Sequence, residues 1–177
     1  TACAICGGEV TVTGAKPAHL ASVTGILRRA GAEVTELTNG ATVRSDGSPR
    51  APGRIETAPY PGFPTDLQSP LTALAALSRG TTYIIENLFE NRFRHIPQLR
   101  KMGADITVCG RAATVRGRRL NGSDVEAEDL RGGAALVLAA LGAEGTSTVS
   151  GLSHTDRGYY DLGGKLSSLG ADIRRLP

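Results

Sequence analysis

The order of apolar and polar residues along the chain predicts short strands alternating with helices. Residues 7–12 alternate in polarity, which is typical of a half-buried strand. Apolar residues then recur at helical spacing over 20–30, and Gly31 stands where a helix would end. A hairpin over 33–44 follows, with Asn39-Gly40 as its turn. The first part of the chain therefore predicts a strand, a helix and a hairpin.

This pattern recurs along the chain. Three strings resemble one another: LRRAGAEV (27–34), LRKMGADI (99–106) and LSSLGADI (166–173). A strand-like segment containing glycine precedes each of them: 7–12, 79–84 and 144–149. Self-similarity of this kind indicates a repeated structural unit. We expect three internal repeats, at about 7–58, 79–122 and 144–177, of which the third reaches Pro177 without room for a returning strand.

More apolar helices are predicted between the repeats. Residues 65–77 open with Thr-Asp-Leu-Gln, which matches a capping box, although Pro70 would cost a hydrogen bond unless the helix starts later. Residues 129–141 are apolar nearly all round, which predicts a buried helix. TACAIC at 1–6 is expected to be the tail of a third such helix, so the first repeat would be truncated. The predicted fold class is α/β, with three βαββα-type repeats around a shared core.

The charge pattern narrows the possible partners. The net charge is only +3, and Lys and Arg are scattered apart from the cluster at 116–119. With three Phe, four Tyr and no Trp, the chain offers few stacking platforms for nucleic acid, which counts against an RNA-binding βαββ domain. No apolar run approaches the ~18 residues of a membrane helix. A phosphorylated small molecule is the favoured partner, with neither nucleic acid nor membrane.

The cysteines and sequence motifs predict neither a metal nor a cofactor. Cys3, Cys6 and Cys109 cannot form a closed disulfide framework, which favours a reducing cytoplasm. The CxxC pair is interpreted as buried small residues, although a redox or zinc pair stays open. The chain contains no HExxH, GxGxxG or GxxxxGK[ST] motif.

Polar residues recur at equivalent corners of the repeats. Asp66 and Arg131 each lie 14 residues before a repeat glycine, at the expected start of an inner helix, where N–H groups and the dipole favour anions. Arg92 and Arg157 lie in loops that lead into outer helices. The repeat symmetry could gather such residues at one end of the domain.

Purely structural roles stay open for the same residues. Asp66 could be a favourable first-turn acid, and Arg131 could form a structural ion pair. Arg157 could pair with Asp156 or Asp161 on a solvated face.

Four long strings resemble the UDP-N-acetylglucosamine enolpyruvyl transferase family. They are PYPGFPTDLQ (59–68), FENRFRHIPQLRKMGADI (89–106), DLRGGAALVLAAL (129–141) and HTDRGYYDLGGKLSSLGADIRR (154–175). The resemblance runs along essentially the whole chain. The sister shikimate-pathway enolpyruvyl transferases share the fold but lack the PTD, FENRF and DLRGGAA strings. The resemblance implies a C-terminal domain over 1–177, built as an inside-out α/β barrel, with an N-terminal partner domain upstream.

The resemblance also implies a reaction and roles for individual residues. The reaction is transfer of the enolpyruvyl group of phosphoenolpyruvate to the 3′-hydroxyl of UDP-N-acetylglucosamine, a step towards peptidoglycan. Asp66 would be the general base, and the Leu88 backbone and Arg92 would meet the nucleotide-sugar. Arg131 and Arg157 would bind phosphoenolpyruvate. The general acid would lie upstream of Thr1, so this chain would supply half an active site and be inactive alone. A non-catalytic module that binds an anionic ligand, or a shikimate-pathway domain, is the alternative.

Overall fold

The computed structural model describes residues 1–176 of the chain. The helices are α1 (Ala2–Cys6), α2 (Ala21–Arg29), α3 (Gln68–Leu77), α4 (Ile96–Lys101), α5 (Leu130–Leu141), α6 (Ser153–Asp156) and α7 (Leu162–Ser168), with 3₁₀ turns η1 (Pro17–Leu20) and η2 (Thr65–Leu67). The strands are β1 (Gly8–Thr13), β2 (Glu33–Leu37), β3 (Gly40–Ser45), β4 (Arg54–Glu56), β5 (Thr81–Ile85), β6 (Asp105–Cys109), β7 (Ala112–Arg116), β8 (Asp124–Glu126) and β9 (Thr148–Ser150).

The strands form three sheets. Their strand orders are β1-β3-β2, β4-β5-β7-β6 and β8-β9. In the first sheet, β3 of the hairpin β2–β3 also pairs antiparallel with β1. In the second sheet, β7 of the hairpin β6–β7 pairs in the same way with β5. The predicted hairpin over 33–44 is confirmed, and the second repeat forms the equivalent hairpin β6–β7. The short strands β4 and β8, which pair parallel with β5 and β9, were missed because three residues carry too little periodicity to be recognised.

The third repeat departs from the prediction after its outer helix. Residues 171–176 follow α7 without forming the strand that the repeat pattern predicted there. An extended segment becomes a strand only when its backbone N–H and C=O groups form hydrogen bonds with a neighbouring strand. Within residues 1–176 no strand pairs with this segment. The predicted end of the repeat at Pro177 lies outside the described residues.

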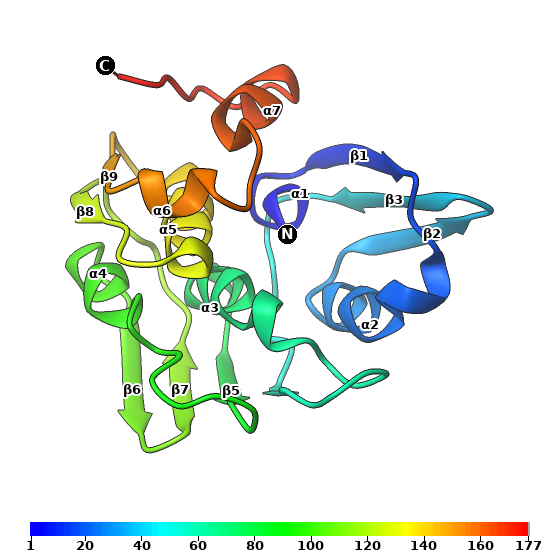
Figure 1. The fold of residues 1–177 in the computed structure, drawn as a ribbon, viewed down its shortest axis with the longest axis horizontal. Helices are drawn as coiled ribbons and strands as arrows, with labels where there is room; N and C mark the ends of the chain where they lie inside the picture. The colour runs from blue at the N-terminus through cyan, green and yellow to red at the C-terminus, as the bar shows by residue number, and fades with distance from the viewer. Residues whose placement is uncertain (177) are drawn as a thin grey trace.

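Three inner helices form the centre of the molecule. Helices α1, α3 and α5 pack against one another and are surrounded by the sheets and outer helices, as Figure 1 shows. The faces of α3 and α5 are buried almost throughout, in keeping with the apolar character of 68–77 and 130–141. The helix predicted at the start of the chain is present as α1. None of the helices in the described part of the chain is long and apolar enough to cross a membrane.

The predicted capping box at Thr65 is wrong. The Thr65 hydroxyl donates to the buried Glu86 carboxylate, and the first segment is the 3₁₀ turn η2. The α-helix starts later, at Gln68. This start places Pro70 within the first helical turn, where its missing N–H is no loss.

Helix α5 is confirmed, with Asp129 as its N-cap. The Asp129 carboxylate accepts hydrogen bonds from the backbone N–H groups of Arg131 and Gly132 at 2.9 and 2.7 Å. Gly133, in the same turn, lies so close to Thr155 of α6 that any Cβ would overlap the threonine hydroxyl. The DLRGG string is therefore a helix start with a close helix contact.

The interpretation of both CxxC cysteines as buried is right for one of them. Cys3 is buried and its thiol donates to backbone carbonyls of Gly8 and Val43, whereas Cys6 is exposed. Both cysteines lie in α1, where Cys3 faces the interior and Cys6, at the end of the helix, faces solvent. Both are free thiols, as is the exposed Cys109.

Candidate functional site

The centre of the candidate site is an ion pair between two inner helices. Asp66 lies in η2, directly before α3, and Arg131 lies in the first turn of α5. Because α3 and α5 pack side by side, the Arg131 Nη2 atom reaches Asp66 Oδ2 at 2.7 Å. The ion pair that the sequence left open for Arg131 is thus formed, and its partner is the candidate base. The hydrogen bond to Asp66 raises the pKa of the Arg131 guanidinium.

A second arginine approaches the same carboxylate. Arg92 Nη2 lies 3.3 Å from Asp66 Oδ1, and its guanidinium stacks 4.7 Å above the Phe89 ring. The Asp66 side chain remains 54% exposed, so solvent and small molecules can reach it. The arrangement is a reachable carboxylate held between two guanidinium groups at the amino-terminal end of the inner helices. Such a site suits an anionic ligand that also presents a hydroxyl group.

Leu88 lies in the loop between β5 and Arg92. Its backbone N–H donates to Glu86 Oε1 at 2.9 Å, and 37% of the residue is exposed. The loop therefore brings the Leu88 backbone to the same end of the domain as Asp66, because Arg92 of this loop contacts Asp66.

Arg157 stands apart from this cluster. It follows α6, is exposed, and donates from Nη2 to His154 Nδ1 at 2.9 Å. The surface pairing with Asp156 that the sequence left open is not formed, because both Asp156 oxygens accept from Arg175. Asp161 instead caps α7. The structure thus joins Asp66, Arg131 and Arg92, and leaves Arg157 in the neighbouring α6 segment.

Two residues of the site were missed in the sequence. Tyr159 is half-buried close enough to Arg131 and Asp66 for both charges to act on its phenol; burial raises its pKa, and Arg131 opposes the shift. Glu86 is a buried carboxylate that ties together the segments carrying Asp66 and Leu88. A charged residue directly after the apolar end of strand β5 was the available signal for Glu86.

A buried histidine lies beneath the cluster. His95 is 3% exposed, and its Cβ lies 3.1 Å from where a Cβ on Gly132 of α5 would stand. Burial lowers the pKa of His95 to about 4, while the Asp129 charge acts in the opposite direction. Neither ring nitrogen forms a hydrogen bond of good geometry among residues 1–176, although the Arg92 backbone lies close enough to act on the ring in the same direction as Asp129. The imidazole is therefore neutral at physiological pH and packs as an almost apolar group.

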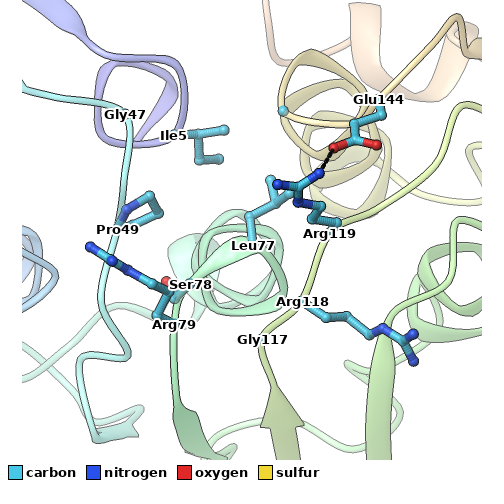
Figure 2. Close-up of a pocket in the computed structure, with 11 residues that line it drawn as sticks. Ile5, Gly47, Pro49, Leu77, Ser78, Arg79, Gly117, Arg118, Arg119 and Glu144 are labelled. Atoms are coloured by element: carbon cyan, nitrogen blue, oxygen red, sulfur yellow. Dashed lines mark hydrogen bonds and ion pairs between the residues drawn. The ribbon is translucent and has the colours of Figure 1, made fainter.

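A hollow lies at the other end of the inner helices. It measures about 320 Å³ and is lined by Ile5 of α1, Leu77 of α3 and Gly142 after α5, together with three arginines (Figure 2). Helix carboxyl ends carry partial negative charge, and Arg119 is already paired with Glu144 at 2.7 Å. We therefore place the candidate site at Asp66 and not in this hollow. Within residues 1–176 no group of three or more His, Cys, Asp or Glu could hold a metal ion.

The fold is that of an enolpyruvyl transferase domain. The structure of the enolpyruvyl transferase NikO from Streptomyces tendae superimposes with a TM-score of 0.84 at 33% identity, over 98% of this chain and 42% of that one. The family model described as EPSP synthase (3-phosphoshikimate 1-carboxyvinyltransferase) matches residues 1–166, so the chain belongs to this family.

Curated relatives point to one branch of the family. A UDP-N-acetylglucosamine 1-carboxyvinyltransferase of Campylobacter fetus is 50% identical over 175 residues, 99% of this chain and 42% of the relative. UDP-N-acetylglucosamine 1-carboxyvinyltransferase 3 of Symbiobacterium thermophilum is 49% identical over 98% of this chain and 41% of its own length. The resemblance drawn from the four strings is confirmed. The chain spans about two fifths of the length of these relatives.

Proposed function

We propose that this chain supplies half of the active site of a UDP-N-acetylglucosamine 1-carboxyvinyltransferase. The reaction transfers the enolpyruvyl group of phosphoenolpyruvate to the 3′-hydroxyl of the nucleotide-sugar and releases phosphate. The observation that carries the proposal is the reachable Asp66 carboxylate between Arg131 and Arg92 at the amino-terminal end of the inner helices. The names of relatives 49–50% identical to this chain support the choice of substrates.

The chemistry assigns one role to the acid and another to the arginines. Asp66 takes the proton of the 3′-hydroxyl as its oxygen bonds to C2 of phosphoenolpyruvate, while C3 gains a proton. Loss of phosphate and of a C3 proton then restores the double bond in the product. Arg131 and Arg157 bind the carboxylate and phosphate of phosphoenolpyruvate, and guanidinium groups suit both anions. They also stabilise the negative charge of the tetrahedral intermediate.

The nucleotide-sugar meets the loop that follows β5. We assign the Leu88 backbone and Arg92 to the sugar end of the site. Their support is positional: the loop is anchored beside Asp66 by Glu86, and Arg92 contacts the Asp66 carboxylate. A sugar hydroxyl at Asp66 would therefore lie within reach of this loop.

A second domain completes the enzyme in our proposal. Residues 1–177 would be a C-terminal domain of three repeats, at about 7–58, 79–122 and 144–177, arranged as an inside-out α/β barrel. An N-terminal domain would supply the general acid and the rest of the nucleotide-sugar site. The limited coverage of the relatives supports this division. The free thiols of Cys3, Cys6 and Cys109 support a cytoplasmic location.

Reconstitution tests the proposal. This chain is mixed with the N-terminal domain of a UDP-N-acetylglucosamine 1-carboxyvinyltransferase, and phosphate release from phosphoenolpyruvate is measured with and without UDP-N-acetylglucosamine. Release that requires both substrates and both domains is the expected result. 3-Phosphoshikimate serves as the control acceptor. Release with this acceptor instead, or no release with either, would refute the proposed function.

A further inference from the structure

Glu86 is a buried carboxylate that the proposed chemistry does not use. It follows β5 and is 1% exposed. Its Oε1 atom accepts hydrogen bonds from Thr57 Oγ1 at 2.9 Å, Leu88 N at 2.9 Å and Phe89 N at 3.1 Å. Its Oε2 atom accepts from Thr65 Oγ1 at 2.8 Å. A buried carboxylate is costly unless it is fully hydrogen-bonded, and these four donors satisfy it.

The four donors belong to three separate segments of the chain. Thr57 follows β4, and Thr65 directly precedes Asp66 in η2. Leu88 and Phe89 begin the loop that carries Arg92. One carboxylate therefore joins the backbone beside the candidate base to the loop assigned to the sugar. We call this set of hydrogen bonds around the Glu86 carboxylate the Glu86 junction. Thr57 adds a further bond to it, since its hydroxyl also accepts from the Asn87 N–H at 2.9 Å.

The direct contact between Asp66 and Arg92 is a weaker link between the same segments. It is a single 3.3 Å contact at the end of a long side chain, with half of the Asp66 side chain exposed. Such pairs contribute little and hold their geometry loosely. The Glu86 bonds instead restrain two backbone N–H groups and two β-branched side chains. Backbone anchoring of this kind can hold a reacting group within a fraction of an ångström.

We propose that Glu86 is a positioning residue that sets the distance between the Asp66 carboxylate and the Leu88–Arg92 loop. This inference rests on the proposed function. Glu86 itself touches no substrate; it acts through Thr65 on one side and through the Leu88 and Phe89 N–H groups on the other.

Two substitutions at Glu86 separate geometry from charge. Glu86→Gln keeps a carbonyl oxygen for Leu88 N–H and Phe89 N–H, and its new amide N–H₂ can donate to the Thr65 hydroxyl, which is able to accept. Glu86→Ala leaves the buried backbone donors unpaired. The glutamine variant should therefore restore what the alanine variant loses.

Thr65→Val removes only the hydrogen bond from the Thr65 hydroxyl to Glu86, which is the link towards Asp66. Its matched control is Thr72→Val, because Thr72 is buried in α3 and its hydroxyl donates to the Gln68 carbonyl at 2.9 Å, away from the site. Both changes remove one hydrogen-bonded threonine hydroxyl from the same part of the chain. A difference between them reports on positioning and not on general loss of a hydrogen bond.

The variants are compared in the reconstituted enzyme by kcat and by KM for UDP-N-acetylglucosamine. Thr65→Val should lower kcat on the order of 10²-fold, as small misplacements of a reacting group do, with KM changed far less. Glu86→Ala should lower kcat and raise KM, while Glu86→Gln and Thr72→Val stay close to the wild type. Equal kcat for Thr65→Val and Thr72→Val, or a failure of Glu86→Gln to restore kcat, would overturn the inference.

A second measurement needs no activity. In the isolated chain, hydrogen exchange of the Leu88 and Phe89 amides should accelerate roughly tenfold or more in Glu86→Ala, because each loses its acceptor, and should stay slow in Glu86→Gln. Unchanged exchange in Glu86→Ala sinks the inference. An inactive wild-type mixture with accelerated exchange in Glu86→Ala refutes the proposed function alone and supports the Glu86 junction.

Discussion

Replacing His95 with leucine should remove part of the acid sensitivity of this domain. The imidazole is enclosed against the first turn of α5, and burial lowers its pKa from 6.5 to about 4. Its ring nitrogens form no hydrogen bond of good geometry in the described part of the chain, so leucine would remove only a weak contact with the Arg92 backbone. The substitution removes the titrating group while it keeps an apolar side chain branched at Cγ.

The magnitude follows from the difference between the folded and unfolded states. Between pH 6.5 and about 4 the unfolded chain binds a proton at His95 that the folded chain excludes. The folded state is therefore favoured fully above pH 6.5, and this stability is lost as the pH falls towards 4. At 1.36 kcal/mol for each pKa unit, the loss amounts to about 3 kcal/mol.

Urea unfolding at a series of pH values, followed by circular dichroism, measures the effect. The free energy of unfolding of His95→Leu should fall about 3 kcal/mol less than that of the wild type between pH 6.5 and 4. Any packing cost of leucine shifts the whole curve and leaves this difference intact. The matched control substitution is His19→Leu, which removes an exposed imidazole in place of the buried one. Parallel curves for His95→Leu and the wild type would refute the reasoning.

Three further predictions concern the site and its support. In the reconstituted enzyme, Asp66→Asn should lower turnover about 10²–10⁴-fold through loss of the general base, measured by phosphate release, with a small change in nucleotide-sugar affinity by calorimetry. Arg157→Ala should weaken phosphoenolpyruvate binding about 10- to 100-fold in calorimetry, because it removes a charge-assisted contact. Gly133→Ala should lower the free energy of unfolding by about 1–3 kcal/mol, because its Cβ would overlap the Thr155 hydroxyl. Its control is Gly25→Ala in α2, where a Cβ meets nothing within 4 Å and helix propensity should stabilise by up to about 1 kcal/mol.

Each of these predictions has a contrary outcome. Wild-type turnover in Asp66→Asn would remove the general-base role. Undiminished phosphoenolpyruvate affinity in Arg157→Ala would place Arg157 outside the anion site. Equal stability of the Gly133→Ala and Gly25→Ala variants would show that α5 and α6 can separate without cost.

Much of the fold could be predicted because its signals are local. The helix before Gly31, the hairpin at Asn39-Gly40 and the helix capped by Asp129 all depend on spacings within a few residues. Strand and helix periods and turn residues act over that range. The repeats added a second, independent signal, since three similar strings are expected to fold alike.

The candidate site was predicted in part. Asp66, Arg131 and Arg92 were chosen from their places in the repeats and from the family resemblance, and the structure brings them together. Tyr159 and Glu86 were missed, because nothing near them in the sequence shows which distant groups they face. The base role of Asp66 and the substrate roles of Arg131 and Arg157 stay predictions.

The sequence by itself determined the repeated units, the buried inner helices and the residue types available for chemistry. Only the tertiary structure decided that the Thr65 hydroxyl would bind Glu86 and not cap its own helix. It also decided that three residues at 54–56 would form β4, and that residues 171–176 would form no strand. The physical reason is that buried hydrogen bonds and strand pairs join segments far apart in the chain. Their partners are chosen by packing, which local sequence does not encode.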